Sequence, residues 1–188
     1  ELECWGNNQY GASSPPAAPA GATFVEVATG LTREFFFDGR DGYGCGLLSS
    51  GEVTCWGANY LGTPPSYLPA AAPAGRQYRR IDTETGLVCG IRISGELDCW
   101  GDNYFELVSN TPSGRFVDVS LGRRHICAVR ADGATICWGY ESGTDGVTNV
   151  AQDRARPQPA WFTMVSAAPE FRCARTSDGV IDCWGSRL

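Results

Sequence analysis

The chain has 188 residues, 21 of them Asp or Glu and 15 of them Lys or Arg, which gives a formal net charge of −6. Nucleic-acid-binding proteins usually carry a basic stripe, so this acidic balance argues against a phosphate-binding face. No run of about 18 apolar residues occurs and no charged-then-apolar leader precedes Glu1, so we expect neither a membrane span nor a signal peptide in this chain. Nine cysteines are typical of an oxidising compartment and predict a secreted or cell-surface protein.

A short sequence unit recurs along the whole chain. An incomplete copy, Leu2-Glu-Cys4-Trp5-Gly6, opens the chain, and four complete copies with the pattern C-x5-G-x3-C-W-G follow. Successive Cys-Trp-Gly cysteines are 51, 44, 38 and 46 residues apart, close to the roughly 40–50 residues of a four-stranded propeller blade. The internal repeats therefore set the architecture, and insertions and deletions fall in the loops.

Each complete copy predicts a β-hairpin. Apolar residues alternate on both sides of a small polar turn, and a glycine stands where the turn is expected to need a positive φ. Folding the first hairpin about Ser50 sets Cys45 opposite Cys55, because facing residues of paired strands share one face. A bridge across so short a loop is worth roughly 3 kcal/mol in the chain-entropy model. We therefore expect four disulfides, Cys45–Cys55, Cys89–Cys99, Cys127–Cys137 and Cys173–Cys183.

The same ten-residue rule leaves Cys4 without a partner inside the chain. The tryptophan after each second cysteine points to the face opposite the sulfurs, and the glycine that follows it permits a close neighbour. Its fixed place in the repeat favours packing between blades, and a ring of exposed tryptophans that binds sugars is the alternative. The residues concerned are Trp5, Trp56, Trp100, Trp138 and Trp184.

Another apolar strand precedes each hairpin. It begins with an aromatic residue followed three positions later by Val or Ile, and these aromatics are Phe24, Tyr78, Phe116 and Phe162. The first repeat has ten extra residues before its hairpin, at about 34–43. Pro/Ala-rich connections separate the repeats and can carry a fourth strand, and no helical periodicity competes. We expect one repeat domain over 1–188, with a blade-terminal strand at 1–6 and repeats at about 7–57, 58–101, 102–139 and 140–185.

These motifs resemble the regulator-of-chromosome-condensation family of β-propellers, and within it the extracellular, cysteine-stapled branch typified by Crinkly4-type receptor ectodomains. The resemblance implies an all-β, propeller-type array of about four and a half blades, part of a larger propeller or of one completed by another chain. Intracellular members carry G-x-x-H before the middle strand, and only Gly122-Arg-Arg-His125 keeps it here. Tyr43, Leu87 and Phe171 take the histidine position in the other repeats, which argues against the intracellular function.

No residue pattern predicts catalysis. His125 has no recurring Ser, Cys or carboxylate beside it, so we interpret it as a packing residue. Zinc sites favour close C-x2–4-C pairs, whereas the paired cysteines here lie ten residues apart. The acidic loops around Asp38 and Asp145 lack the ligand density that calcium needs. We expect no metal, no cofactor and no enzymatic activity.

Two Pro-rich loops resemble hydroxyproline-glycosylation or O-glycosylation contexts. A plain extended linker is the alternative, since Pro-rich segments adopt polyproline II unaided. The residues concerned are Ser13, Ser14, Pro15, Pro16, Thr63, Pro64 and Pro65.

The predicted function is that of a structural or recognition module outside the cell. We expect a building block of an extracellular assembly, such as a surface fibre, formed by self-association or with other protein chains. A ligand-binding receptor or adhesin ectodomain is the alternative. Nucleotide exchange on a small GTPase, which the family resemblance implies, is a more distant third because the disulfides and the acidic charge do not support it.

The first strand of the chain is surplus. The last hairpin already contains its own Cys-Trp-Gly strand at 180–185, so Glu1–Gly6 has no unfinished hairpin to complete. We expect it to pair with something beyond these residues, either a preceding segment or a neighbouring copy. An exposed strand edge would otherwise be an aggregation site.

Overall fold

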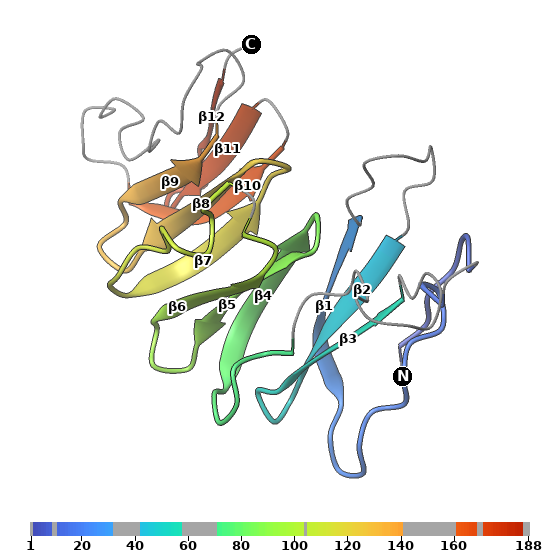
Figure 1. Ribbon diagram of the computed structural model, residues 1–188. Helices are drawn as coiled ribbons and strands as arrows, with labels where there is room; N and C mark the ends of the chain where they lie inside the picture. The colour runs from blue at the N-terminus through green and yellow to red at the C-terminus, as the bar shows by residue number, and fades with distance from the viewer. Residues whose placement is uncertain are drawn as a thin grey trace.

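The computed structural model describes residues 2–8, 11–31, 42–57, 71–103, 105–140, 161–168 and 171–185. These residues form four three-stranded antiparallel sheets, which we call blades 1 to 4 in chain order (Figure 1). No helix occurs in the described ranges. The prediction of an all-β, propeller-type repeat array is therefore confirmed.

Every blade is built from three consecutive strands. Blade 1 contains β1 (Phe24–Leu31), β2 (Gly42–Leu48) and β3 (Val53–Gly57), and blade 2 contains β4 (Tyr78–Glu84), β5 (Leu87–Arg92) and β6 (Leu97–Gly101). Blade 3 contains β7 (Phe116–Leu121), β8 (His125–Arg130) and β9 (Thr135–Gly139), and blade 4 contains β10 (Phe162–Ala167), β11 (Phe171–Thr176) and β12 (Ile181–Gly185). The first strand of each blade contacts the first strand of the next blade, so we call the three strands inner, middle and outer. The blades form an open row with blades 1 and 4 at its ends (Figure 1).

The middle and outer strands of each blade are the hairpins that the repeats predict. Cys45 lies opposite Cys55 in the β2–β3 register, and the other three pairs face each other in the same way. All four disulfides are formed, with Sγ–Sγ distances of 2.02–2.10 Å. Gly51 in the first hairpin turn has φ +84°, the left-handed conformation that favours glycine. The sequence reasoning about hairpins and disulfides is confirmed.

The apolar core lies between blades and not inside any one of them. Tyr43, Cys45 and Leu47 on the middle strand of blade 1 pack against Ile81 and Val88 of blade 2. A second cluster joins blades 2 and 3, and a third joins blades 3 and 4. The cysteine side of a middle strand is therefore fully buried only when the next blade is present.

Trp56, Trp100 and Trp184 each lie close to the aromatic residue that opens their own inner strand. The ring centroids of Tyr78 and Trp100 are 5.2 Å apart, and those of Phe162 and Trp184 are 6.3 Å apart. Trp100 also belongs to the cluster between blades 1 and 2. Trp5 is different, because its side chain is 90% exposed. The expectation that Trp5 packs between blades is wrong for the chain alone, since no described strand pairs with residues 2–6.

Acceptor side chains connect each inner strand to the next. A β-bulge follows the opening aromatic of every inner strand, and it turns the second residue after the aromatic towards the neighbouring blade. Glu26 at this position accepts a hydrogen bond from the Ile81 amide at 3.0 Å. Asp118 accepts one from the Val165 amide at 2.7 Å. These contacts satisfy N–H groups that the sheet ladders leave unpaired.

A second set of such contacts involves the inner-strand residue two positions after the bulge residue. Asp82 accepts a hydrogen bond from the Leu121 amide at 2.8 Å, and Ser120 accepts one from the Ala167 amide at 3.0 Å. Burial raises the pKa of Asp82, although hydrogen bonds from Leu121, Thr83 and Ser120 oppose that rise. The same two positions thus connect three successive pairs of blades.

Arg80 joins the first set of acceptors into a chain. It occupies the bulge position of blade 2, where blades 1 and 3 carry a carboxylate. Its guanidinium forms an ion pair with Glu26 of blade 1 and another with Asp118 of blade 3, the latter at 2.7 Å between Nε and Oδ1. One cation therefore bridges three blades.

The disulfides are expected to stabilise the fold. Replacing both Cys89 and Cys99 with Ser should lower the free energy of unfolding by about 3 kcal/mol, because the unfolded chain loses a short cross-link. Thermal unfolding followed by circular dichroism measures the change, and a thiol reductant should lower the melting temperature of the unaltered protein in the same direction. Cys4→Ser serves as the control and should leave the melting temperature unchanged. An equal melting temperature with and without reductant contradicts this prediction.

Removal of the Asp118 carboxylate is expected to destabilise the protein more than removal of an exposed carboxylate. Asp118→Ala removes the acceptor for a buried amide and one ion-pair partner of Arg80. We expect the free energy of unfolding to fall by about 2 kcal/mol. This is less than the full cost of breaking a buried ion pair, because Arg80 is partly solvated. Urea unfolding of the variant measures this loss. Asp132→Ala, in the exposed β8–β9 turn, is the matched control and should cost about 0.5 kcal/mol or less. Similar losses of unfolding free energy for the two variants would show that the inter-blade contact of Asp118 does not stabilise the protein.

Candidate protein-interaction site

Each end of the row exposes an apolar residue at a position that is buried at every junction between blades, Val27 at one end and Phe171 at the other. Val27 on β1 is 45% exposed, whereas the equivalent residues of the other inner strands, Ile81, Val119 and Val165, are 0–2% exposed. Each of these three side chains is covered by the preceding blade. The outward side of β1 is therefore one half of an inter-blade interface without its other half.

The far end of the row shows the complementary half. Ile181 on β12 is 68% exposed, whereas its equivalent in blade 2, Leu97, is 7% exposed. Phe171 on β11 is exposed as well, and its equivalent Leu87 is buried. In blade 2 the side chains at these positions pack against blade 3. We call the outward side of β1 the blade-1 face, and the side of blade 4 that carries Phe171 and Ile181 the blade-4 face.

A loop that follows the Cys-Trp-Gly strand locks consecutive blades together. The indole Nε1 of Trp138 donates to the carbonyl of Leu107 at 2.9 Å, and that of Trp56 donates to the carbonyl of Ala12 at 3.0 Å. Both acceptors lie seven residues after a tryptophan of the repeat, Trp100 in one case and Trp5 in the other. Each of these two loops therefore covers the tryptophan of the blade that comes next.

An asparagine three residues after the tryptophan holds this loop. Asn103 accepts a hydrogen bond from the Val108 amide at 2.8 Å, and its side-chain amide donates to Ser109 Oγ at 2.6 Å. Asn8 makes the equivalent contacts with the Ser13 amide and with Ser14 Oγ, at 3.0 and 2.8 Å. The sequence interpretation missed this role. The recurrence of W-G-x-N at residues 5–8, 56–59 and 100–103 was the signal that could have revealed it.

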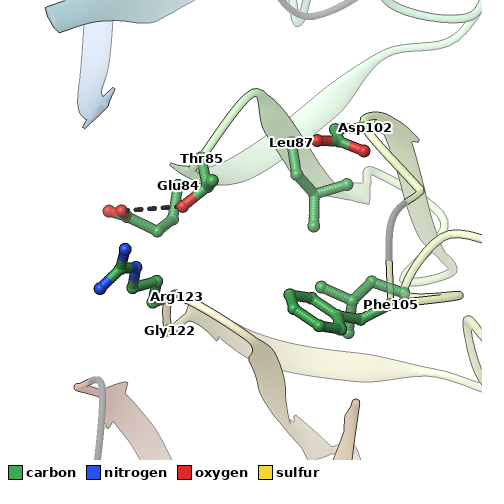
Figure 2. A pocket seen from close by; sticks show the side chains of 8 residues that line it. Glu84, Thr85, Leu87, Asp102, Phe105, Gly122 and Arg123 are labelled. Atoms are coloured by element: carbon green, nitrogen blue, oxygen red, sulfur yellow. Dashed lines mark hydrogen bonds between the residues drawn. The ribbon is translucent and has the colours of Figure 1, made fainter. Parts of the chain in front are cut away.

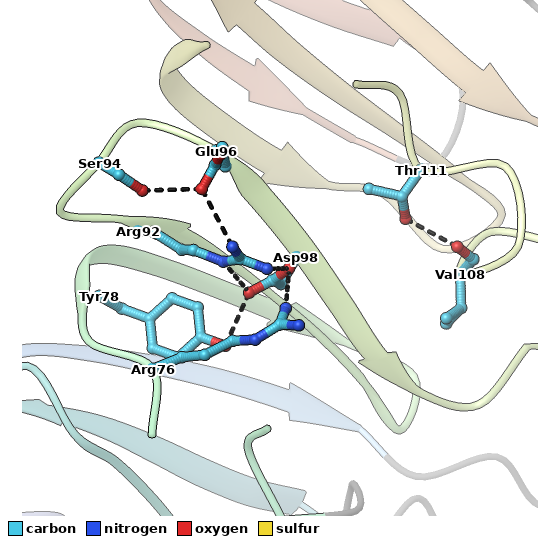
Figure 3. A network of polar contacts seen from close by, with 8 residues as sticks. All are labelled: Arg76, Tyr78, Arg92, Ser94, Glu96, Asp98, Val108 and Thr111. Atoms are coloured by element: carbon cyan, nitrogen blue, oxygen red, sulfur yellow. Dashed lines mark hydrogen bonds and ion pairs between the residues drawn. The ribbon is translucent and has the colours of Figure 1, made fainter. Parts of the chain in front are cut away.

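Blade 2 carries a cluster of charged groups at its outer side (Figure 3). Asp98 accepts from Arg92 at 2.6 Å, from Arg76 at 2.5 Å and from the Tyr78 hydroxyl at 3.0 Å. Burial alone would raise the pKa of Asp98, but these hydrogen bonds outweigh it and the pKa is lowered. Arg92 also pairs with Glu96 at 3.0 Å. The cluster lines a pocket of about 480 Å³, yet its charges are engaged with one another, so we interpret it as a structural feature.

A smaller pocket lies between blades 2 and 3 (Figure 2). Figure 2 shows Glu84 and Arg123 on one side of it and Leu87 and Phe105 on the other. The Thr85 hydroxyl donates to Glu84 at 3.1 Å. The pocket has about 20 Å³ of free space, room for about one water molecule. Small-molecule sites are typically about 300–1,000 Å³, so this pocket does not indicate an organic ligand.

The structure describes His125 and some of the candidate metal-binding and glycosylation residues. His125 is buried and its ring lies against Gly122, consistent with a packing role. No group of three or more potential metal ligands occurs in the described ranges, and the loops around Asp38 and Asp145 fall outside them. Of the predicted glycosylation loops, Ser14 is exposed and its hydroxyl accepts from Asn8. The remaining described members are Ser13, Pro15 and Pro16, while Thr63, Pro64 and Pro65 fall outside the described residues.

No helix that is long and apolar enough to cross a membrane occurs in the described part of the chain. The free Cys4 is partly buried, and residues 2–8 adopt no strand conformation. Whether Glu1–Gly6 pairs with a preceding segment or with a neighbouring copy therefore stays a prediction.

Comparison with known proteins identifies the fold. No family model and no curated protein sequence matches the chain, but solved structures do. The CRINKLY WD40 ectodomain of the Arabidopsis thaliana receptor kinase ACR4 is 26% identical, with a TM-score of 0.60 over 85% of this chain and 59% of that one. The entire ectodomain of the Physcomitrella patens receptor kinase CR4 is 21% identical, with a TM-score of 0.59 over 84% of this chain and 42% of that one.

Yeast RCC1 (Prp20), solved in complex with Kap60, is 17% identical, with a TM-score of 0.69 over 97% of this chain and 51% of that one. The chain thus spans 42–59% of the length of these three structures. At this identity the likeness to yeast RCC1 concerns the fold alone. The repeats, the four stapled hairpins and these matches agree: the chain is an RCC1-like β-propeller repeat array, similar to the Crinkly4-type receptor ectodomains.

Proposed function

We propose that the protein is a non-enzymatic building block of an extracellular protein assembly, such as a surface fibre or appendage. The observation that carries this proposal is the pair of open end faces. Val27 at one end and Phe171 at the other are exposed, although their equivalents are buried wherever two blades meet. Apolar faces of this kind are typical of protein–protein contact surfaces.

The covalent and polar structure of the chain supports the same proposal. Four disulfides stabilise the blades and favour a location outside the cytosol. The ectodomain neighbours favour that location as well. The most prominent charged cluster, around Asp98, is engaged in ion pairs within blade 2. A role in binding and shape therefore fits the chain better than a role in chemistry.

A receptor or adhesin ectodomain is the second candidate. The structural neighbours in its favour are ectodomains of plant receptor kinases. Propellers bind partners with their loops and end surfaces as well as with their edges, so this candidate needs no open end face. Nucleotide exchange on a small GTPase has only the shared fold in its favour.

Immunolabelling of cells that produce the protein tests the proposal. Electron microscopy should show regularly repeated, label-bearing structures on the cell surface. Ile181→Asp should abolish or fragment them, because it places a charge on the blade-4 face. Ile93→Asp is the matched control, since Ile93 is 61% exposed in a hairpin turn away from either end face. Isolated single particles on the membrane favour the receptor candidate, and label confined to the cytosol refutes both.

Nucleic-acid binding is expected to be weak. The net charge of −6 opposes the phosphate backbone, so a filter-binding titration with duplex DNA at low salt should give no submicromolar affinity. Low salt is the demanding condition, because electrostatic binding is strongest there. Submicromolar binding that weakens steeply with added salt is the result that would contradict this expectation.

A further inference from the structure

The segment before blade 1 repeats the geometry of a junction between two blades. The described residues of 6–8 and 11–14 repeat contacts that the described residues of 101–103 and 105–109 make before blade 3. Asn8 and Asn103 hold the two loops, and Ala12 and Leu107 accept from the tryptophan of the blade that follows. The φ angles at the start also agree, +116° at Gly6 and +109° at Gly101. The chain just before Gly6 therefore arrives where an outer strand lies at the other junction.

The position before Gly6 has an outer strand's sequence but not its surroundings. The equivalent glycines in blades 1 to 3 are Gly57, Gly101 and Gly139. A Cβ added at any of them would lie only 2.3–2.9 Å from a backbone oxygen near the start of the middle strand of the same blade. A Cβ at Gly6 meets nothing within 4 Å. Trp5 is 90% exposed, whereas the equivalent Trp100 is 6% exposed. Residues 2–6 thus carry the sequence of the outer strand of a further blade without its strand conformation, and the middle and inner strands of that blade are not among the described residues.

The blade-1 face indicates which side chains the inner and middle strands of that further blade must carry. At the junctions between blades, carboxylates on the preceding inner strand accept from the Ile81 and Val165 amides. The corresponding amide here is that of Val27. A second acceptor, like Ser120 opposite Ala167, belongs opposite Thr29. The middle strand must also place a cysteine opposite Cys4, as Cys89 lies opposite Cys99.

A second copy of this chain does not meet these requirements through its blade 4. That blade already contains β12, whose Cys183 is bonded to Cys173. Residues 2–6 and a partner's β12 would compete for one position. The bulge position of β10 is occupied by Met164, which offers the Val27 amide no carboxylate. The occupant must lack an outer strand and must carry an acceptor.

We propose that the blade-1 face binds an incomplete blade, a two-stranded antiparallel hairpin that residues 2–6 complete as the third strand. Its inner strand carries Asp or Glu two residues after an aromatic, and its middle strand carries a thiol that forms a disulfide with Cys4. This proposal rests on the proposed function and names the chemistry of one partner in the assembly. Strand addition of this type supplies affinity through main-chain hydrogen bonds and specificity through alternate side chains.

The covalent step is a two-electron oxidation. The thiols of Cys4 and of the partner cysteine each lose one proton and together lose two electrons, and one S–S bond forms. An oxidant of the disulfide class, such as glutathione disulfide, accepts the electrons and leaves as two thiols after two exchange steps. Pairing of the strands precedes and directs this step, because it brings the two sulfurs together.

A peptide with the sequence of residues 115–130 is a suitable probe. It supplies an inner strand with Asp118 and Ser120, a middle strand, and one cysteine, Cys127. The intact protein is mixed with this peptide in a glutathione redox buffer, and the adduct at Cys4 is quantified by mass spectrometry. Two control peptides are used, one scrambled around a retained cysteine and one with residues 127 and 128 exchanged. The native peptide should give at least about tenfold more adduct than either control, since tenfold corresponds to about 1.4 kcal/mol of templated binding.

A variant of the protein separates templating from simple thiol reactivity. Val27→Asp should reduce the adduct towards the yield of the control peptides, whereas Ile93→Asp, an equally exposed site elsewhere, should not. Equal yields from all three peptides, or a Cys4–Cys4 dimer as the main product, overturn the proposal. These outcomes are independent of the microscopy above, so surface assemblies without templated coupling would refute the partner and retain the function.

Discussion

The structure depends on contacts between blades, because no blade can bury its own middle strand. The first cysteine of the stapled hairpin has no exposed surface in blades 1, 2 and 3, and in each case the following blade covers it. In blade 4 the equivalent Cys173 is only partly buried. A three-stranded sheet of this size has too little apolar surface to fold independently. Stability therefore rises with each neighbour that is added, as in other repeat proteins.

The disulfides stabilise single blades and do not hold the blades to one another. Each bridge joins the middle and outer strands of one blade, so it stabilises the hairpin and its register. No bridge connects two blades in the described residues. Apolar packing and acceptor side chains on the inner strands hold the blades to each other. Mild conditions that weaken burial are thus expected to separate blades before hairpins open.

Local features of the fold could be predicted from the sequence, because constant spacing determines them. The pairing of Cys45 with Cys55 follows from the two-residue period of facing strands, and the turn glycine follows from its place between them. The junctions could not be predicted in the same way. The bulge after each opening aromatic changes which residue faces the next blade, and no alternation of apolar and polar residues marks it. The sequence therefore does not distinguish Glu26 and Asp118 from ordinary exposed charges.

Trp5 illustrates the same limit at the end of the row. A repeat-based argument assigns it the surroundings of Trp100, because both residues share one motif. Burial, however, depends on the strands that lie beside it, and these are not among the described residues. The motif therefore predicts an outer strand at residues 2–6, but it does not predict whether the strands that would pair with it are present.

The junctions also have a direction, and this constrains any assembly. One side of each junction contributes acceptors such as Asp118, and the other contributes backbone amides such as that of Val165. The two sides are different surfaces, so identical faces cannot pair with each other through these contacts. An interface of this type is heterologous, and heterologous contacts continue until rotation closes a ring or a filament grows. Whatever binds the blade-1 face must therefore present acceptors, and whatever binds the blade-4 face must present an inner strand with free amides.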